Sequence, residues 1–142
     1  MSSPFHLSLL LKMITDRVDA LITRELAVQG ITAAQGRVLA FVVARNGKRV
    51  TQKDIERHLG VSHTTAKGLV ERLERKGMLT AAFDNEDDGR LKSVYLTDKS
   101  RAIHREIGPH IAAIENTLLG GLSSEERALL MRFAERMYAN IQ

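Results

Sequence analysis

Hydrophobic positions recur at helical spacing along most of the chain. The first run, from Leu7 to Leu26, places apolar residues three and four apart and is closed by Gly30, which predicts a long amphipathic helix. The next segment, Thr32 to Gln35, reads "TAAQ" and has capping-box spacing, so it should open a second, shorter helix that "RNGKR" ends. The chain is therefore expected to begin with two helices.

The segment 50–79 predicts two helices separated by a tight turn. Thr51 is expected to cap the first of these helices, which Gly60 stops, and Ser62 is expected to cap the second, which ends at Gly77. In the second helix the apolar residues share one face, and the opposite face is polar: His63, Thr64, Lys67, Gly68, Glu71 and Arg72.

The rest of the chain predicts a hairpin followed by further helices. "MLTAAF" and "LKSVYLT" are short strand-like runs that flank an acidic stretch, with a hairpin turn expected at "DDG". Thr97 should cap another helix, which we expect to be interrupted and kinked at Gly108 and Pro109. Ser123 and Glu126, at capping-box spacing, should open the last helix. The fold class is mainly α with a small β-hairpin.

Composition narrows the functional class. The 142 residues, 44% hydrophobic and 27% charged, are typical of one ordered domain, and a partner subunit could complete its core. A net charge of +4 favours a polyanionic partner only weakly. Since there is no cysteine, disulfides, thiolate metal sites and cysteine nucleophiles are excluded. The sequence contains no recognisable catalytic motif, signal sequence or membrane span. We therefore expect a cytoplasmic protein that is not an enzyme and needs no cofactor.

Over nearly its whole length the sequence resembles the MarR family of winged helix-turn-helix transcriptional regulators. The resemblance is carried by "DIERHLGVSHTTAKGLVERLERKGML", by the wing-like "DDGRLKSVYLTDKS", and by "LSSEER" before the last helix. It implies one domain, residues 1–142, in which 1–30 and 98–142 form dimerisation helices and 31–97 form the winged DNA-binding lobe. It also implies a homodimer that represses from a pseudo-palindromic operator on double-stranded DNA. A small aromatic or phenolic effector would relieve repression from a cleft between the two parts.

The start of a helix in the major groove usually makes the specific base contacts, and a wing arginine can enter the minor groove or grip phosphate. Asp88 could orient Arg90 through its carboxylate. Gly68 either permits close approach to DNA or is merely tolerated, and Arg72 could instead be a helix-surface charge. The residues expected to contact DNA are Ser62, His63, Thr64, Thr65, Lys67, Gly68 and Arg72 from the helix and Arg90 and Lys92 from the wing.

These sequence features admit three other interpretations. Calcium binding by the acidic stretch from Asp84 fails, because the position of the closing bidentate Glu in an EF-hand loop holds Tyr95. A zinc-responsive regulator would need His104, Glu106 and His110 to meet in space, and no metal site is predicted from their spacing. A winged helix that binds protein rather than specific DNA stays open, and the residues of the effector pocket cannot be assigned.

Overall fold

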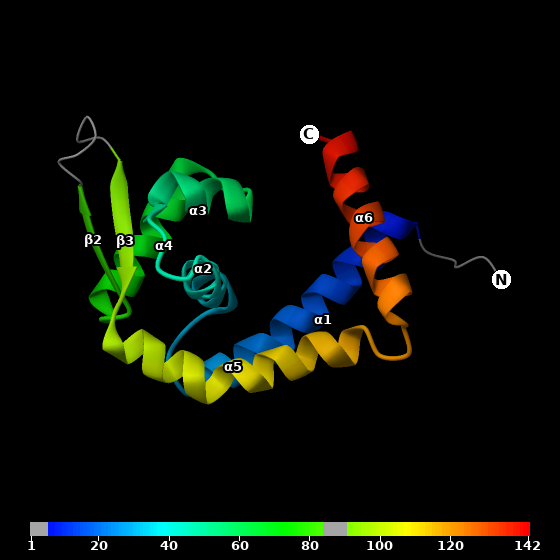
Figure 1. Cartoon of the computed structure of the whole chain (residues 1–142), viewed down its shortest axis with the longest axis horizontal. Coiled ribbons are helices and arrows are strands. Elements are labelled where there is room, and N and C mark those ends of the chain that lie inside the picture. The colour runs from blue at the N-terminus through cyan, green and yellow to red at the C-terminus, as the bar shows by residue number, and fades with distance from the viewer. Residues whose placement is uncertain (1–5, 84–90) are drawn as a thin grey trace.

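The computed structural model describes residues 6–83 and 91–142, which form a compact lobe and a long helical arm (Figure 1). The lobe holds the middle of the chain, and the arm holds its two ends. In chain order the elements are α1 (Leu7–Ala27), α2 (Ala33–Ala44), β1 (Val50–Thr51), α3 (Gln52–Leu59), α4 (His63–Arg75), β2 (Leu79–Phe83), β3 (Lys92–Leu96), α5 (Asp98–Leu118) and α6 (Ser124–Asn140).

The predicted helix starts are confirmed at each capping residue. Four helices begin with a capping box. In this motif the side chains of the cap residue and of the third helical residue each accept a hydrogen bond from the other residue's backbone N–H. Ser62 caps α4 by accepting from the backbone N–H of Thr65. Gly60 ends α3 at φ 64°, a left-handed conformation that favours glycine. The four capping-box residues are Thr32, Thr51, Thr97 and Ser123.

The sheet contains the expected pair of strands and one strand more. β2 and β3 pair antiparallel, with Thr80 opposite Tyr95, so the predicted pairing is confirmed. β1 adds to the other edge of β3, with Val50 opposite Val94. β1 was not predicted, because two residues are too few to show the alternation of a strand. The predicted turn at "DDG" lies outside the described residues.

α5 corrects one prediction. The expected interruption at Gly108 and Pro109 is wrong, because α5 runs unbroken from Asp98 to Leu118 and only bends along its length (Figure 1). A proline removes one N–H from the ladder, but the neighbouring turns keep theirs. Ile103 and Ile107, before the proline, are buried in the core and hold this part of the helix in place.

The core lies in the lobe and extends to the near end of the arm. Leu26 of α1 packs with α2, α3, α4 and the sheet, and α5 closes the same cluster. α1 and α5 run side by side, and α6 turns back at the far end of the arm (Figure 1). α6 has no buried residue at all. The lobe is thus a packed unit, whereas the end of the arm exposes its apolar side chains.

Candidate nucleic-acid interface

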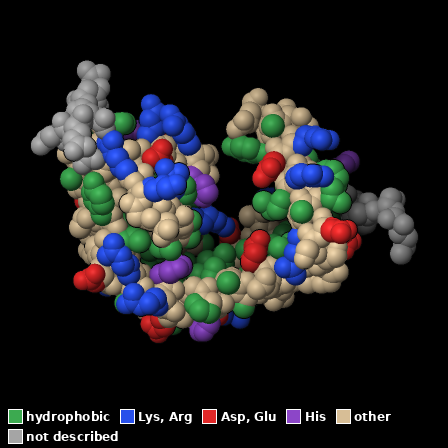
Figure 2. Space-filling model, viewed as in Figure 1, with side chains coloured by type: hydrophobic (Ala, Val, Ile, Leu, Met, Phe, Trp, Pro, Cys, Tyr) green, Lys and Arg blue, Asp and Glu red, His purple; other side chains and the backbone are tan. Residues whose placement is uncertain are grey.

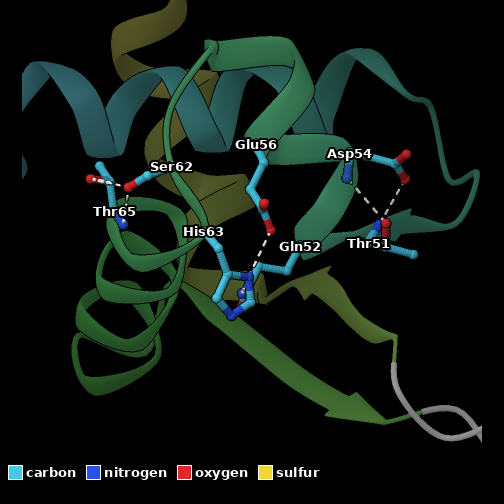
Figure 3. A network of polar contacts seen from close by, with 7 residues as sticks. All are labelled: Thr51, Gln52, Asp54, Glu56, Ser62, His63 and Thr65. Atoms are coloured by element: carbon cyan, nitrogen blue, oxygen red, sulfur yellow. Dashed lines mark hydrogen bonds and ion pairs between the residues drawn. The ribbon is translucent and has the colours of Figure 1, made fainter.

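The turn between α3 and α4 fixes where α4 begins. The Ser62 Oγ accepts from the Thr65 N–H at 3.1 Å and donates to the Thr65 Oγ1 at 3.0 Å (Figure 3). The inner face of α4 is fully buried, so the helix has no freedom to roll about its axis. The buried residues are Ala66, Leu69, Val70 and Leu73.

The opposite edge of α4 carries the predicted contact residues. Gly68 is partly buried, and a Cβ there would lie 3.5 Å from the Arg72 Nη1, so the Arg72 side chain lies over this glycine. That distance is an ordinary contact, so the glycine is not required by packing within the chain. The structure brings the other predicted residues together on one exposed surface: Ser62, His63, Thr64, Thr65, Lys67 and Arg72. Their contact with DNA stays a prediction.

His63 is oriented by a carboxylate that was not among the predicted site residues. Its Nδ1 lies 3.0 Å from the Glu56 Oε2 of α3, and the Gln52 amide lies beside the ring (Figure 3). The His63 side chain nevertheless stays 70% exposed. The ring therefore faces outward with its angle set by α3. The signal in the sequence was a Glu seven residues before the histidine, across the turn.

A groove of about 670 Å³ separates the start of α4 from the wing sheet. Lys53, His63 and Lys67 line its helical side, and Lys92 lines its strand side. Lys67 is exposed, and its Nζ lies 4.0 Å from the Glu71 carboxylate, which is a weak pairing for a surface charge. We name this the reading groove. A basic, exposed channel beside a helix start can follow the phosphates of a polyanion.

Lys92 has a partner inside the lobe. Its Nζ lies 3.3 Å from the Glu74 Oε1 on α4, and both side chains are less than a third exposed. This ion pair connects β3 to α4 and positions the wing. The predicted contact of Lys92 with DNA remains a prediction. Asp88 and Arg90, the predicted wing pair, lie outside the described residues.

The end of α4 is tied to the helices of the arm. The Lys76 Nζ donates to the Gln35 Oε1 at 2.7 Å and to the carbonyl oxygen of Gly30. The Lys99 Nζ donates to the Lys76 carbonyl at 2.8 Å. The Thr97 hydroxyl donates to the next carbonyl, that of residue 77, at 2.7 Å. The position of α4 is thereby coupled to the α1–α2 junction and to the start of α5.

The histidines of α5 do not assemble a metal site in the part of the chain that the structure describes. No three His, Asp or Glu residues within 6–83 and 91–142 come close enough to hold an ion. The His110 Nδ1 instead lies 3.2 Å from the Glu25 carboxylate of α1. Within the same ranges no helix has the length and apolar character needed to cross a bilayer.

Comparisons with known proteins agree with this arrangement. The sequence profile of the MarR family matches residues 29–91, which span α2, β1, the α3–α4 helix pair and β2 and end just before β3. The chain is 26% identical over 108 residues to the uncharacterized HTH-type transcriptional regulator YdgJ of Bacillus subtilis, covering 76% of this chain and 65% of that protein. It is 28% identical over 124 residues to the transcriptional activatory protein BadR of Rhodopseudomonas palustris, covering 84% and 69%.

Solved structures extend the likeness to the arm. MepR of S. aureus in its DNA-binding conformation superposes with a TM-score of 0.90 at 28% identity, covering 97% of this chain and 100% of that one. The MepR–DNA complex gives a TM-score of 0.88 at 27% identity, covering 99% and 100%. These proteins are regulators of transcription and not enzymes. By profile over residues 29–91, by sequence relatives and by fold, the chain is similar to the MarR family of winged-helix transcriptional regulators.

Proposed function

We propose that the chain is a homodimeric repressor that binds a pseudo-palindromic operator with α4 in the major groove. The observation that carries this proposal is the division of α4 into a fully buried apolar face and an exposed polar edge, beside a basic groove. Thr64 can offer a hydroxyl and a methyl group to base edges, and Lys67 can reach guanine or phosphate. The likeness to MepR in complex with DNA supports the same use of this surface.

Dimerisation follows from apolar surface that this chain does not cover. Hydrophobic side chains are exposed along α6, where Phe133 is 52% exposed, and at Ile141, which follows the helix and is 83% exposed. α1 and α5 form an apolar groove of about 310 Å³ near their far ends, lined by Met13, Val18 and Leu118 among others. Figure 2 shows hydrophobic side chains on both sides of the hollow between the lobe and α6. A second copy of the chain would bury these surfaces, since monomers rarely expose so much contiguous apolar area.

A small aromatic effector has a candidate pocket between the lobe and the arm. The pocket measures about 260 Å³ and is lined by apolar side chains of α1, α2 and α5, including Leu26, Leu39 and Ile107. This volume suits a ligand with a single ring, because drug-sized ligands occupy larger sites. α5 also holds the end of α4 through Thr97 and Lys99. A ligand that separates α2 from α5 would therefore move α4 and weaken DNA binding.

The test is a filter-binding titration of the full-length protein on a duplex, repeated over a series of salt concentrations. A dimer that neutralises several phosphates should lose affinity steeply with salt, by about 0.9 log units per phosphate per log unit of salt. Thr64→Val should change the preference among operator variants by about 1 to 3 kcal/mol without changing the salt slope. Affinity that is flat in salt would contradict the proposal and favour a protein-binding winged helix.

A reporter gene placed behind the selected operator tests the direction of regulation. Repression predicts that expression rises when the regulator is deleted. BadR is named as an activator, so a fall in expression on deletion would replace repression with activation and leave the DNA contacts unchanged.

A further inference from the structure

The reading groove contains a carboxylate among its basic side chains. Glu56 is the one acidic residue among the described residues that line the groove, whereas Lys53, Lys67 and Lys92 are basic. A carboxylate at this place repels a phosphate backbone and weakens the binding of a polyanion. The Glu56 side chain is 20% exposed and points toward the His63 ring (Figure 3). Its negative charge therefore has a role other than the attraction of DNA.

The local structure holds both members of this pair in place. Glu56 follows Ile55, whose side chain is fully buried and fixes the rotation of α3. The capping box between Thr51 and Asp54 fixes the start of the same helix (Figure 3). His63 is the first residue of α4, and the serine cap fixes the start of that helix. Little freedom is lost when the two side chains meet, so the contact is preorganised.

Two neighbours of the His63 ring require opposite states of the same nitrogen. The His63 Nδ1 lies 3.0 Å from the Glu56 Oε2 and 3.5 Å from the Gln52 Nε2. A carboxylate only accepts hydrogen bonds, whereas an amide nitrogen only donates them. The contact with the carboxylate is shorter and involves a charge, whereas 3.5 Å is at the limit of a hydrogen bond, so the carboxylate decides. His63 therefore carries a proton on Nδ1 and donates it to Glu56.

This proton determines what the other ring nitrogen can bind. Within residues 6–83 and 91–142 the His63 Nε2 has no hydrogen-bond partner, and it lies on the ring edge that faces away from Glu56 (Figure 3). In a neutral ring, a proton on Nδ1 leaves Nε2 as an acceptor. In the major groove adenine and cytosine present an amino donor, whereas guanine and thymine present a carbonyl oxygen. An acceptor at Nε2 thus favours adenine or cytosine.

We propose that Glu56 is a positioning residue that holds the His63 proton on Nδ1, so that Nε2 accepts a hydrogen bond from the amino group of adenine or cytosine. The inference rests on the proposed function, because it requires α4 in the major groove. Base selection then depends on a residue of α3 that itself touches no base. Without the carboxylate, the Gln52 amide donates to Nδ1 and the proton moves to Nε2. The preference then reverses to guanine or thymine.

The position of the proton can be measured on the free protein. Proton–nitrogen correlation NMR of the histidine rings at about pH 8, where an ordinary histidine is neutral, shows which nitrogen is protonated. His63→Gln identifies the signal. We expect the proton on Nδ1 in the wild type and on Nε2 in Glu56→Met, which keeps the aliphatic stem. Glu106→Met removes a carboxylate from an exposed position on α5 and should leave the signal unchanged. A wild-type ring protonated on Nε2 would overturn the proposal.

Selection of duplexes from a random pool at the same pH tests the base. The position at which His63→Ala loses its preference marks the contact. There the wild type and Glu106→Met should favour adenine or cytosine by about fivefold, as for one neutral hydrogen bond, and Glu56→Met should favour guanine or thymine. An operator whose contacted base lacks its amino group should bind the wild type about fivefold more weakly, which requires no variant.

The outcomes separate this inference from the proposed function. A symmetric motif that His63→Ala leaves unchanged would refute the inference and leave the proposed function standing. A pool without any motif would refute both. If Glu56→Met loses the preference without reversing it, the carboxylate only supports the turn between α3 and α4, and the inference is wrong.

Discussion

Lys76 connects the end of α4 to the α1–α2 junction, and its removal should destabilise the protein. Lys76→Met keeps the aliphatic stem but deletes the ammonium group that donates to the Gln35 amide oxygen and to the Gly30 carbonyl. Hydrogen bonds that involve a charged group contribute roughly 1.5 to 3 kcal/mol each. Gly30 is exposed, and the Gln35 oxygen retains the Thr32 N–H as a donor, so water and the cap offset part of the loss. We expect the free energy of unfolding to fall by about 2 kcal/mol.

Equilibrium unfolding in urea measures this loss. With a denaturant slope of about 2 kcal/mol per molar, the midpoint should fall by about 1 M. The variants must be compared at one protein concentration, because the unfolding of a dimer depends on it. Lys67→Met is the matched control on the same helix. Because the ion pair between Lys67 and Glu71 is exposed and long, its loss should lower the free energy of unfolding by less than about 0.5 kcal/mol. If Lys76→Met is as stable as this control, the coupling of α4 to the arm through Lys76 is refuted.

Three further predictions concern the ion pair and the caps. In a double-mutant cycle on urea unfolding, Lys92→Met and Glu74→Gln should couple by about 0.5 kcal/mol, and additivity would show that the 3.3 Å pair contributes nothing. Ser62→Ala should lower the free energy of unfolding by about 1 kcal/mol in the same assay, and an unchanged midpoint would contradict the role of the cap. Hydrogen bonds from the Ser123 backbone N–H, and secondly from its hydroxyl, lower the pKa of Glu126. The ionised Glu126 should therefore stabilise the start of α6 at pH values above the ordinary Glu pKa. This stabilisation should be lost as the pH falls through the lowered pKa. Amide exchange at that helix start should follow this pH dependence in the wild type and lose it in Glu126→Gln.

Local patterns were enough to predict most of the fold. Capping at Thr51 and Ser62, and the glycine stop at residue 60, depend on hydrogen bonds within four residues, and such signals are visible in the sequence. The continuity of α5 through Pro109 was not predictable in this way. The packing of Ile103 and Ile107 against the lobe outweighs the loss of one hydrogen bond, and that packing is tertiary.

The sequence predicted which residues share the exposed edge of the candidate site, but it did not predict the contacts that those residues make with other elements. Periodicity placed the polar residues of α4 on one edge, and the structure confirms that they share it. The carboxylate beside His63 and the contact between Lys92 and Glu74 join different elements, so no local pattern reports them. The reading groove and the apolar pocket likewise exist only where separate helices and strands meet.

Selection of duplexes from a random pool by the full-length protein tests the central claim most directly. A paired molecule that presents α4 twice should enrich a motif with two-fold symmetry, whose half-sites are separated by about one duplex turn, roughly 10 base pairs. Lys67→Gln should alter the preferred bases at the same symmetric positions in both half-sites. A pool that shows no enriched motif, or a single half-site without symmetry, would contradict the account.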